Sequence, residues 1–541
     1  MSRNGIRALI GAVALGIGSP ASAASYYGDL SAYLRARAAD ADGAKAVAAS
    51  GYAEALNADP GNVEIAARAY RAGLAVGDMA LVTKARHLLE AADVAPADAA
   101  LLALAEAVLA NDAQKTDSAL AALNKGPFAF LAPSATAWVR FQKDPNGARA
   151  ALDNRPVDPL AARFIRETRA MIGVANGDDD NAAALLKLLA GIDLNSGALR
   201  VEAAQFLAHN GNSAEAQSLL ADNDPTVAAY RAVLGKGIAP TARVGIARLY
   251  LRLAETLAEG RASTISVALA RAASQLEPAN DRTRLIIATA LTAAGVPDAA
   301  LAALDKIPRD SPERHGADEQ RVAALQGADR NDEALAAGRL LDDAPGATSE
   351  DAQRLGDLLF AANRFDDAAR AYAKAIDRAG TDADWTLHLQ LGGALERAGH
   401  WDKAEPELAQ AVALAPQSPI ALNYLGYAQL EHGTPPADAT KLLERASALK
   451  PDSASILDSL AWGYFLGGQT ARALPLFERA AAGEPANSAI NEHLGDVYWA
   501  SGRYYEARYA WQAAALTAAS EDSQRIQDKI ANGSSIPTKT K

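Results

Sequence analysis

The chain of 541 residues contains no cysteine. It therefore forms no disulfide, and its folded state does not depend on the redox state of its compartment. Cysteine is also missing as a metal ligand, and the seven histidines are scattered without the spacing of a metal site. We therefore expect no metal ion and no cofactor.

Aromatic residues make up only 6% of the chain, although half of all residues are hydrophobic. Strands favour aromatic and β-branched side chains, whereas alanine, which is abundant here, has the highest helix propensity. The composition argues against sheets and predicts an almost entirely helical chain. A chain of this length is too long for one compact core, but the core of a solenoid grows with each added repeat.

Long hydrophobic runs are also missing, and no stretch reaches the length that a transmembrane helix needs. The first 23 residues resemble a secretory signal peptide. Arg3 and Arg7 precede a short apolar run, and residues 21–23 form a small-residue cleavage site. We therefore expect a signal peptide over residues 1–23, cleavage after Ala23 and a periplasmic location.

Positive charge is in the minority, because 53 lysines and arginines face 65 acidic residues and the net charge is −12. The basic residues are dispersed, with no run that could form a basic patch. An acidic surface repels a phosphate backbone. We therefore exclude nucleic acid as a partner.

A 34-residue pattern is present instead, and it recurs five times between residues 349 and 516. Four of the units have a glycine or alanine at position 8, alanines at positions 20 and 27, and a large residue at positions 11 and 24, whereas the unit at Pro419 carries one extra residue, which the loop 433–436 absorbs. Small residues let helix backbones approach closely, and the large ones fill the space between them. The five units start at Ser349, Trp385, Pro419, Ala454 and Ser488. The pattern resembles the tetratricopeptide repeat (TPR) and implies an all-α, right-handed solenoid of helix pairs.

Upstream of these units the helical period persists but the TPR pattern fades. We expect degenerate helical repeats over residues 24–240 and weakly TPR-like repeats over residues 241–348. Five TPRs follow over residues 349–519. Residues 520–541 are expected to form a C-terminal cap helix and a disordered tail.

Catalytic motifs are weak. Ser447 and Lys450 have the Ser-x-x-Lys spacing of penicillin-recognising enzymes, but the companion Lys-Thr-Gly and Ser-Asp-Asn motifs are absent. The acidic run 178–180 lacks the glycine and the terminal glutamate of an EF-hand loop, and a helix N-cap explains it more simply. The sequence therefore does not indicate an enzyme.

Ten aromatic residues lie within residues 462–511, and four of them occupy the packing positions of the repeat. The TPR resemblance implies a concave groove lined by positions 2, 5, 9 and 12 of each first helix, here aromatic with an acidic rim. The predicted partner-binding residues are Asn423, Tyr427, Asp458, Trp462, Phe465, Glu492, Asp496 and Trp499. Aromatic anchors commonly dominate interface energy, so we expect a protein or peptide partner. Packing on the C-terminal cap and self-association as a homo-oligomer are the alternatives.

Three segments, residues 423–427, 456–464 and 491–499, resemble a proteobacterial envelope subfamily of TPR proteins. Some of its members are adaptors that bind carboxyl-terminal processing proteases and deliver cell-wall hydrolases to them. Those adaptors are typically lipoproteins, whereas this chain has no cysteine for a lipid. The resemblance implies a periplasmic scaffold or adaptor that binds envelope proteins and presents substrates to a protease. The alternative is a scaffold of a polysaccharide secretion or envelope assembly machine.

Overall fold

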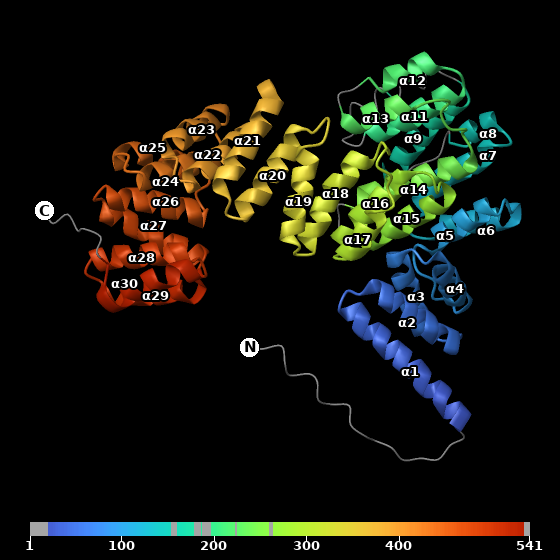
Figure 1. Ribbon diagram of the computed structural model, residues 1–541, viewed down its shortest axis with the longest axis horizontal. Coiled ribbons are helices and arrows are strands. Elements are labelled where there is room, and N and C mark those ends of the chain that lie inside the picture. Colours follow the sequence, from blue (N-terminus) through green and yellow to red (C-terminus); the bar gives the residue numbers. More distant parts are fainter. Residues whose placement is uncertain are drawn as a thin grey trace. The chain divides into compact units, whose positions relative to one another are not determined.

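The computed structural model describes residues 20–152, 159–177, 186, 196–221, 224–258 and 263–534. Every regular element within them is a helix, which confirms the predicted all-α fold (Figure 1). None of the described helices is both long and apolar enough to cross a membrane. Residues 1–19 of the predicted signal peptide and residues 535–541 of the predicted tail lie outside the described residues.

The chain divides into two compact units, Met1–Ala337 (unit 1) and Gly338–Lys541 (unit 2). The described helices of unit 1 are α1 (Pro20–Ala41), α2 (Lys45–Ala58), α3 (Val63–Val76), α4 (Met79–Ala91), α5 (Ala99–Leu109), α6 (Ala113–Lys125), η1 (Ala129–Leu131), α7 (Ala132–Phe141), α8 (Pro145–Ala150), α9 (Pro159–Ala175), α11 (Ser196–His209), α12 (Ser213–Leu219), α13 (Pro225–Val233), α14 (Ala242–Ala258), α15 (Ser263–Leu276), α16 (Asp281–Ala293), α17 (Pro297–Leu304) and α18 (Arg314–Gly327). Helix α19 (Asn331–Asp342) spans the division.

Unit 2 consists of helix pairs followed by one additional helix. Its helices are α20 (Ser349–Ala361), α21 (Phe365–Ala379), η2 (Gly380–Asp382), α22 (Trp385–Arg397), α23 (Trp401–Leu414), α24 (Pro419–Glu431), α25 (Pro436–Leu449), α26 (Ala454–Leu466), α27 (Thr470–Gly483), α28 (Ser488–Ala500), α29 (Tyr504–Thr517) and α30 (Ser520–Asn532). The first helix of each pair starts at the first residue of a predicted repeat.

Local sequence signals set the starts of these helices. Thr348 and Asp351 form a capping box at α20, in which each side chain accepts a hydrogen bond from the backbone of the other. Asp384 caps α22, and Asn487 caps α28. Such caps satisfy backbone N–H groups that have no partner within the helix.

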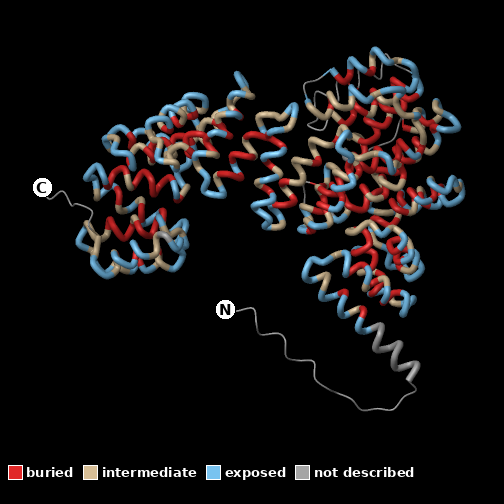
Figure 2. Tube along the Cα trace, in the orientation of Figure 1, coloured by how far each residue is buried: buried red, intermediate tan, exposed pale blue. Residues whose placement is uncertain are grey.

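Packing in unit 2 follows the alternation of small and large residues. Gly495 of α28 lies so close to α29 that a Cβ atom there would stand 2.4 Å from the Trp511 ring. A Cβ atom at Gly356 would likewise stand 2.5 Å from the Tyr372 ring. Trp511 and Phe477 are fully buried. Buried residues recur in successive helices of unit 2, as expected for a core that extends from one repeat to the next (Figure 2).

Unit 1 is held together by contacts between residues distant in the sequence. Helices α14 and α15 pack against α3, α5 and α7. The Tyr250 hydroxyl donates a hydrogen bond to the Leu101 carbonyl at 3.0 Å, 149 residues away in the chain. Arg248 of α14 pairs with Glu277 at 2.8 Å and with Glu202 at 3.6 Å, and all three side chains are at most 12% exposed. Buried ion pairs therefore contribute to the core of this unit.

Candidate functional site

The predicted partner-binding residues lie on three neighbouring first helices of unit 2. On each helix they are three or four residues apart, which places them on one face. Helix α26 contacts both α24 and α28. Asn423 and Tyr427 lie on α24, Asp458, Trp462 and Phe465 on α26, and Glu492, Asp496 and Trp499 on α28.

Two of these residues surround a histidine that the sequence did not single out. Asp458 Oδ2 lies 2.9 Å from Nδ1 of His493, which comes from the next repeat. The Trp462 indole stacks on the same imidazole, with 4.4 Å between the ring centroids and 18° between the planes. Trp462 Nε1 also donates a hydrogen bond to Glu431 Oε1 at 3.0 Å. Residues from three consecutive repeats therefore converge around the Trp462 ring.

We call this set, which consists of Tyr427, Glu431, Asp458, Trp462 and His493, the acidic-aromatic face. Burial raises the pKa of the Tyr427 hydroxyl, and the negative charges of Glu431 and Asp458 raise it further. Burial by itself lowers the pKa of His493, but the charge of Asp458 and its hydrogen bond outweigh this effect, so that the pKa is raised. Nearby negative charges therefore contribute to raising both pKa values.

Three carboxylates of this region have no lysine or arginine as a partner, although two of them lie against histidines. Among the described residues, no lysine or arginine forms an ion pair with Glu396, Glu431 or Asp458. Glu396 instead accepts from the Tyr424 hydroxyl at 3.5 Å and lies 3.4 Å from Nε2 of His432. Three negative charges therefore remain uncompensated by a permanent cation within the described part of the chain.

Glu492 and Asp496 are in a different situation, because α30 covers them. Lys529 Nζ lies 2.6 Å from Glu492 Oε1 and 2.6 Å from Asp496 Oδ2. Arg525, one helical turn earlier, also pairs with Glu492. The side chains of the two carboxylates are only 6% and 2% exposed. Both predicted residues therefore anchor α30 in this structure.

Trp499 also packs within the chain. Its ring packs against the buried cluster that contains Trp511 and Ile526. Ile530 of α30 packs against the same cluster. A Cβ atom at Gly533, just after α30, would lie 2.0 Å from the ring, so this backbone presses directly on the indole. The structure therefore places Trp499 under the C-terminal segment.

Phe465 and Asn423 differ from the exposed lining that the pattern predicts. Phe465 is 9% exposed and packs with Phe477 and Leu494 in the core of unit 2. Asn423 is half-buried, and its Oδ1 atom has no hydrogen-bond partner among the described residues. Of the eight predicted residues, Tyr427, Asp458 and Trp462 come together on the acidic-aromatic face, where Asp458 is itself buried.

Glu431 and His493 belong to this face but were missed by the sequence interpretation. They stand at positions 13 and 6 of their repeats, which are outside the positions expected to line the groove. The signal that could have found them is the repeat period itself. Glu431 precedes Trp462 by 31 residues and His493 follows Asp458 by 35, so each pair joins neighbouring repeats.

The two weak motifs of the sequence do not form a site among the described residues. Ser447 is half-buried near the end of α25, and Lys450 is exposed after it. The acidic run 178–180 lies outside the described residues.

Comparison with known proteins identifies the repeat. The tetratricopeptide repeat family model TPR_16 matches residues 354–419, 389–454 and 460–523. The presence of TPRs in unit 2 is thereby confirmed. No curated protein matches the chain.

Several solved structures, two of them described as TPR proteins, resemble part of the chain. MamA is 23% identical over 36% of this chain and 100% of its own, with a TM-score of 0.27. The TPR protein TTC0263 from Thermus thermophilus is 21% identical over 34% and 98%, with a TM-score of 0.30. YrrB, described as a TPR protein with an unusual peptide-binding site, is 18% identical over 32% and 88%, with a TM-score of 0.28.

Proposed function

We propose that this protein is a non-catalytic scaffold that binds a protein partner through the acidic-aromatic face of unit 2. TPRs are protein-interaction modules, and unit 2 contains them. The observation that carries the proposal is that two carboxylates beside the Trp462 ring have no lysine or arginine partner among the described residues: Glu431 accepts from the indole, and Asp458 pairs only with His493. An aromatic side chain with charged neighbours is a frequent anchor of protein interfaces.

Helix α30 indicates the chemistry of the partner. It brings two cations, Arg525 and Lys529, one turn apart onto carboxylates of α28, and it places Ile526 against Trp511. The carboxylates of the acidic-aromatic face lie on α24 and α26, the first helices of the two preceding repeats, and are negatively charged like Glu492 and Asp496, which bind these cations. We infer that the partner is a basic amphipathic segment, with lysines or arginines one turn apart and aliphatic residues beside them.

We place the partner in the cell envelope because residues 1–23 resemble a signal peptide. An adaptor that presents substrates to a protease is the first role to test. A scaffold of a secretion or assembly machine is the second.

The first experiment measures binding of labelled helical peptides to the full-length protein. A peptide with lysines four residues apart should bind, and a glutamate version of the same length should not. Trp462→Ala should weaken binding about tenfold or more, because truncating an interface anchor costs about 2 kcal/mol. Tyr505→Ala is the matched control, since Tyr505 is an aromatic residue of α29 that is 81% exposed. Equal binding of both peptides, or no effect of Trp462→Ala, would contradict the proposal.

A crosslinking pulldown from cell envelopes then identifies the natural partner. Wild-type protein is compared with Trp462→Ala after circular dichroism has shown that the variant is folded. Loss of a protease or wall hydrolase from the variant would support the adaptor role, and loss of secretion components would support the second role. Identical partner sets would assign the interaction to another surface.

A further inference from the structure

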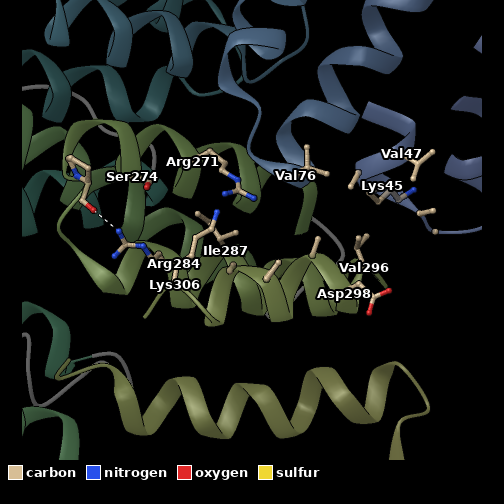
Figure 3. Close-up of a pocket in the computed structure, with 17 residues that line it drawn as sticks. Lys45, Val47, Val76, Arg271, Ser274, Arg284, Ile287, Val296, Asp298 and Lys306 are labelled. Atoms are coloured by element: carbon tan, nitrogen blue, oxygen red, sulfur yellow. Dashed lines mark hydrogen bonds between the residues drawn. The ribbon is translucent and has the colours of Figure 1, made fainter. Parts of the chain in front are cut away.

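Unit 1 contains a cavity of about 560 Å³ that the scaffold function does not use (Figure 3). It lies between the start of α2, the end of α3 and the helices α15, α16 and α17. Its volume falls within the range of small-molecule sites, roughly 300–1,000 Å³. Because all of these helices belong to unit 1, the cavity is a feature of one compact body.

The two ends of the cavity differ. Figure 3 shows Ser274, Arg284 and Lys306 toward one end, Arg271 near the middle, and Lys45 and Asp298 toward the other end. Aliphatic side chains line much of the remainder, and they are Val47, Val76, Ile287, Val296, Ala299, Ala302 and Ala303. The cavity therefore combines a polar, basic end with apolar walls.

Arg271 is held in place by the end of α3. Its Nε donates a hydrogen bond to the Leu74 carbonyl at 3.1 Å, and its Nη2 donates to the Ala75 carbonyl at 3.0 Å. Gly77 has a left-handed φ of +83°, and a Cβ atom there would stand 2.6 Å from Nη1 of Arg271. The glycine therefore provides both the turn and the space that this guanidinium needs.

The charge of Arg271 has no acidic partner within the described part of the chain. No carboxylate of the described residues pairs with it, and burial lowers its pKa to about 10. Nη1 has no hydrogen-bond partner among the described residues. A guanidinium that is fixed, partly desolvated and not neutralised is suited to bind an oxyanion.

The neighbouring groups strengthen this character. Lys306 is exposed at the cavity and forms no ion pair with a described residue, whereas Arg284 is paired with Asp281 and Lys45 with Asp40. Asp298, the only acidic residue among the described residues that line the cavity, is 85% exposed and pairs with Arg330 at 3.6 Å. Arg271 and Lys306, neither of which has an acidic partner among the described residues, therefore line the same cavity in a chain whose net charge is −12.

We propose that this cavity binds a small amphiphilic anion. Its carboxylate or phosphate head group is held by Arg271, Lys306 and the Ser274 hydroxyl, and its apolar tail lies along Val76, Ile287 and Val296. The charged end selects the head group, and the aliphatic walls remove the tail from water. This site is independent of the acidic-aromatic face in unit 2.

Calorimetric titration of the full-length protein with octanoate, octyl phosphate, octanol and inorganic phosphate tests the proposal. One or both of the anionic amphiphiles should bind with 1:1 stoichiometry, and the one that binds identifies the head group. Octanol, which lacks the charge, and inorganic phosphate, which lacks the tail, should bind at least tenfold more weakly. Failure of both amphiphiles to bind, or equal binding of octanol, would overturn the proposal.

Two variants locate the binding site. Lys306→Met should weaken binding at least tenfold, whereas Lys236→Met, which makes the same change at an exposed position of unit 1, should leave it unchanged. Ala299→Phe should also weaken binding, because it fills space between the aliphatic walls. Circular dichroism confirms that each variant is folded. Wild-type affinity in both Lys306→Met and Ala299→Phe would overturn the assignment to this cavity.

Discussion

Unit 1 and unit 2 are both built from helices, but their helices are held together in different ways. In unit 2 a glycine on one helix receives a large side chain of the next helix, as Gly495 receives Trp511. In unit 1, α14 is tied by buried ion pairs, through Arg252 to Glu167 of α9, 85 residues earlier, and through Arg248 to Glu277, which directly follows α15. The comparison teaches that the packing of a repeat can be predicted from the spacing of residues in the sequence. The packing of a non-repetitive core depends instead on individual contacts between residues that the spacing does not relate.

The first test of this comparison removes a buried ion pair from unit 1. Arg248→Met should destabilise unit 1 by about 3–5 kcal/mol, because it leaves Glu202 and Glu277 buried without their cation. Burial already raises the pKa of Glu202 despite the nearby arginine. Native-state hydrogen exchange of peptides from α14 and α15 measures the change.

The control for this variant is an exposed ion pair of unit 2. Arg479 lies 3.8 Å from Asp452, and both side chains are more than half exposed. Arg479→Met should therefore cost less than about 1 kcal/mol. If both substitutions had equal effects, burial would not be what makes the Arg248 ion pairs important for stability.

The second test adds one methyl group to a helix contact of unit 2. Gly495→Ala should destabilise the last helix pair by about 1–3 kcal/mol, because the new Cβ atom overlaps the Trp511 ring. Urea unfolding followed by circular dichroism gives the free energy. In the matched substitution Gly483→Ala, the new atom meets Ala454 at an ordinary 3.4 Å. That variant should be neutral or stabilised by up to about 1 kcal/mol, and a similar loss in both variants would argue against the small-to-large packing rule.

The third test uses pH to probe the buried pair of His493 and Asp458 on the acidic-aromatic face. The pKa of His493 is raised in the folded state, where its imidazole also faces Asp496 and Glu431. The stabilisation is therefore complete below the unfolded pKa of about 6.5 and is lost as pH rises through the folded pKa. Unit 2 should unfold at lower urea concentration at pH 8 than at pH 6, by less than in the two tests above. Asp458→Asn should flatten this dependence, and an unchanged slope in that variant would show that the pair is not its source.

The smallest effect on stability is expected for aromatic residues that cluster in the sequence but are exposed rather than buried in the core. Tyr505 and Tyr509 belong to the aromatic-rich segment 462–511 but are 81% and 72% exposed. Tyr505→Ala should change the free energy of unfolding by no more than about 0.5 kcal/mol. Thermal melts measure this change, and a loss comparable to that of Gly495→Ala would indicate a packing role.

Much of unit 2 could be predicted from its sequence because each repeat contacts only its neighbours. The repeat starts and the alternation of small and large residues were visible in the spacing. The period also selected the helix face on which Tyr427, Asp458 and Trp462 lie. It could not reveal that Phe465 is buried by Leu494, or that Lys529 neutralises Glu492 and Asp496, because these contacts depend on how neighbouring helices are rotated and on where α30 docks.

Unit 1 could be predicted only as far as its helical composition. Nothing in the local pattern links Arg271 to Leu74, which precedes it by 197 residues, or Tyr250 to Leu101. The cavity beside Arg271 arises from that same packing of distant helices. Its basic end therefore has no counterpart as a basic run in the sequence.

By itself the sequence determined the helical class of this protein and the register of the TPRs, because helix propensity and repeat packing act over short separations. Only the tertiary structure decided which charges are neutralised. It covered Glu492 and Asp496 with α30, left Glu396, Glu431 and Asp458 without a permanent cation among the described residues, and placed Arg271 and Lys306 at the same cavity. Electrostatic interactions depend on distance in space and on burial, and neither can be read from the order of residues along the chain.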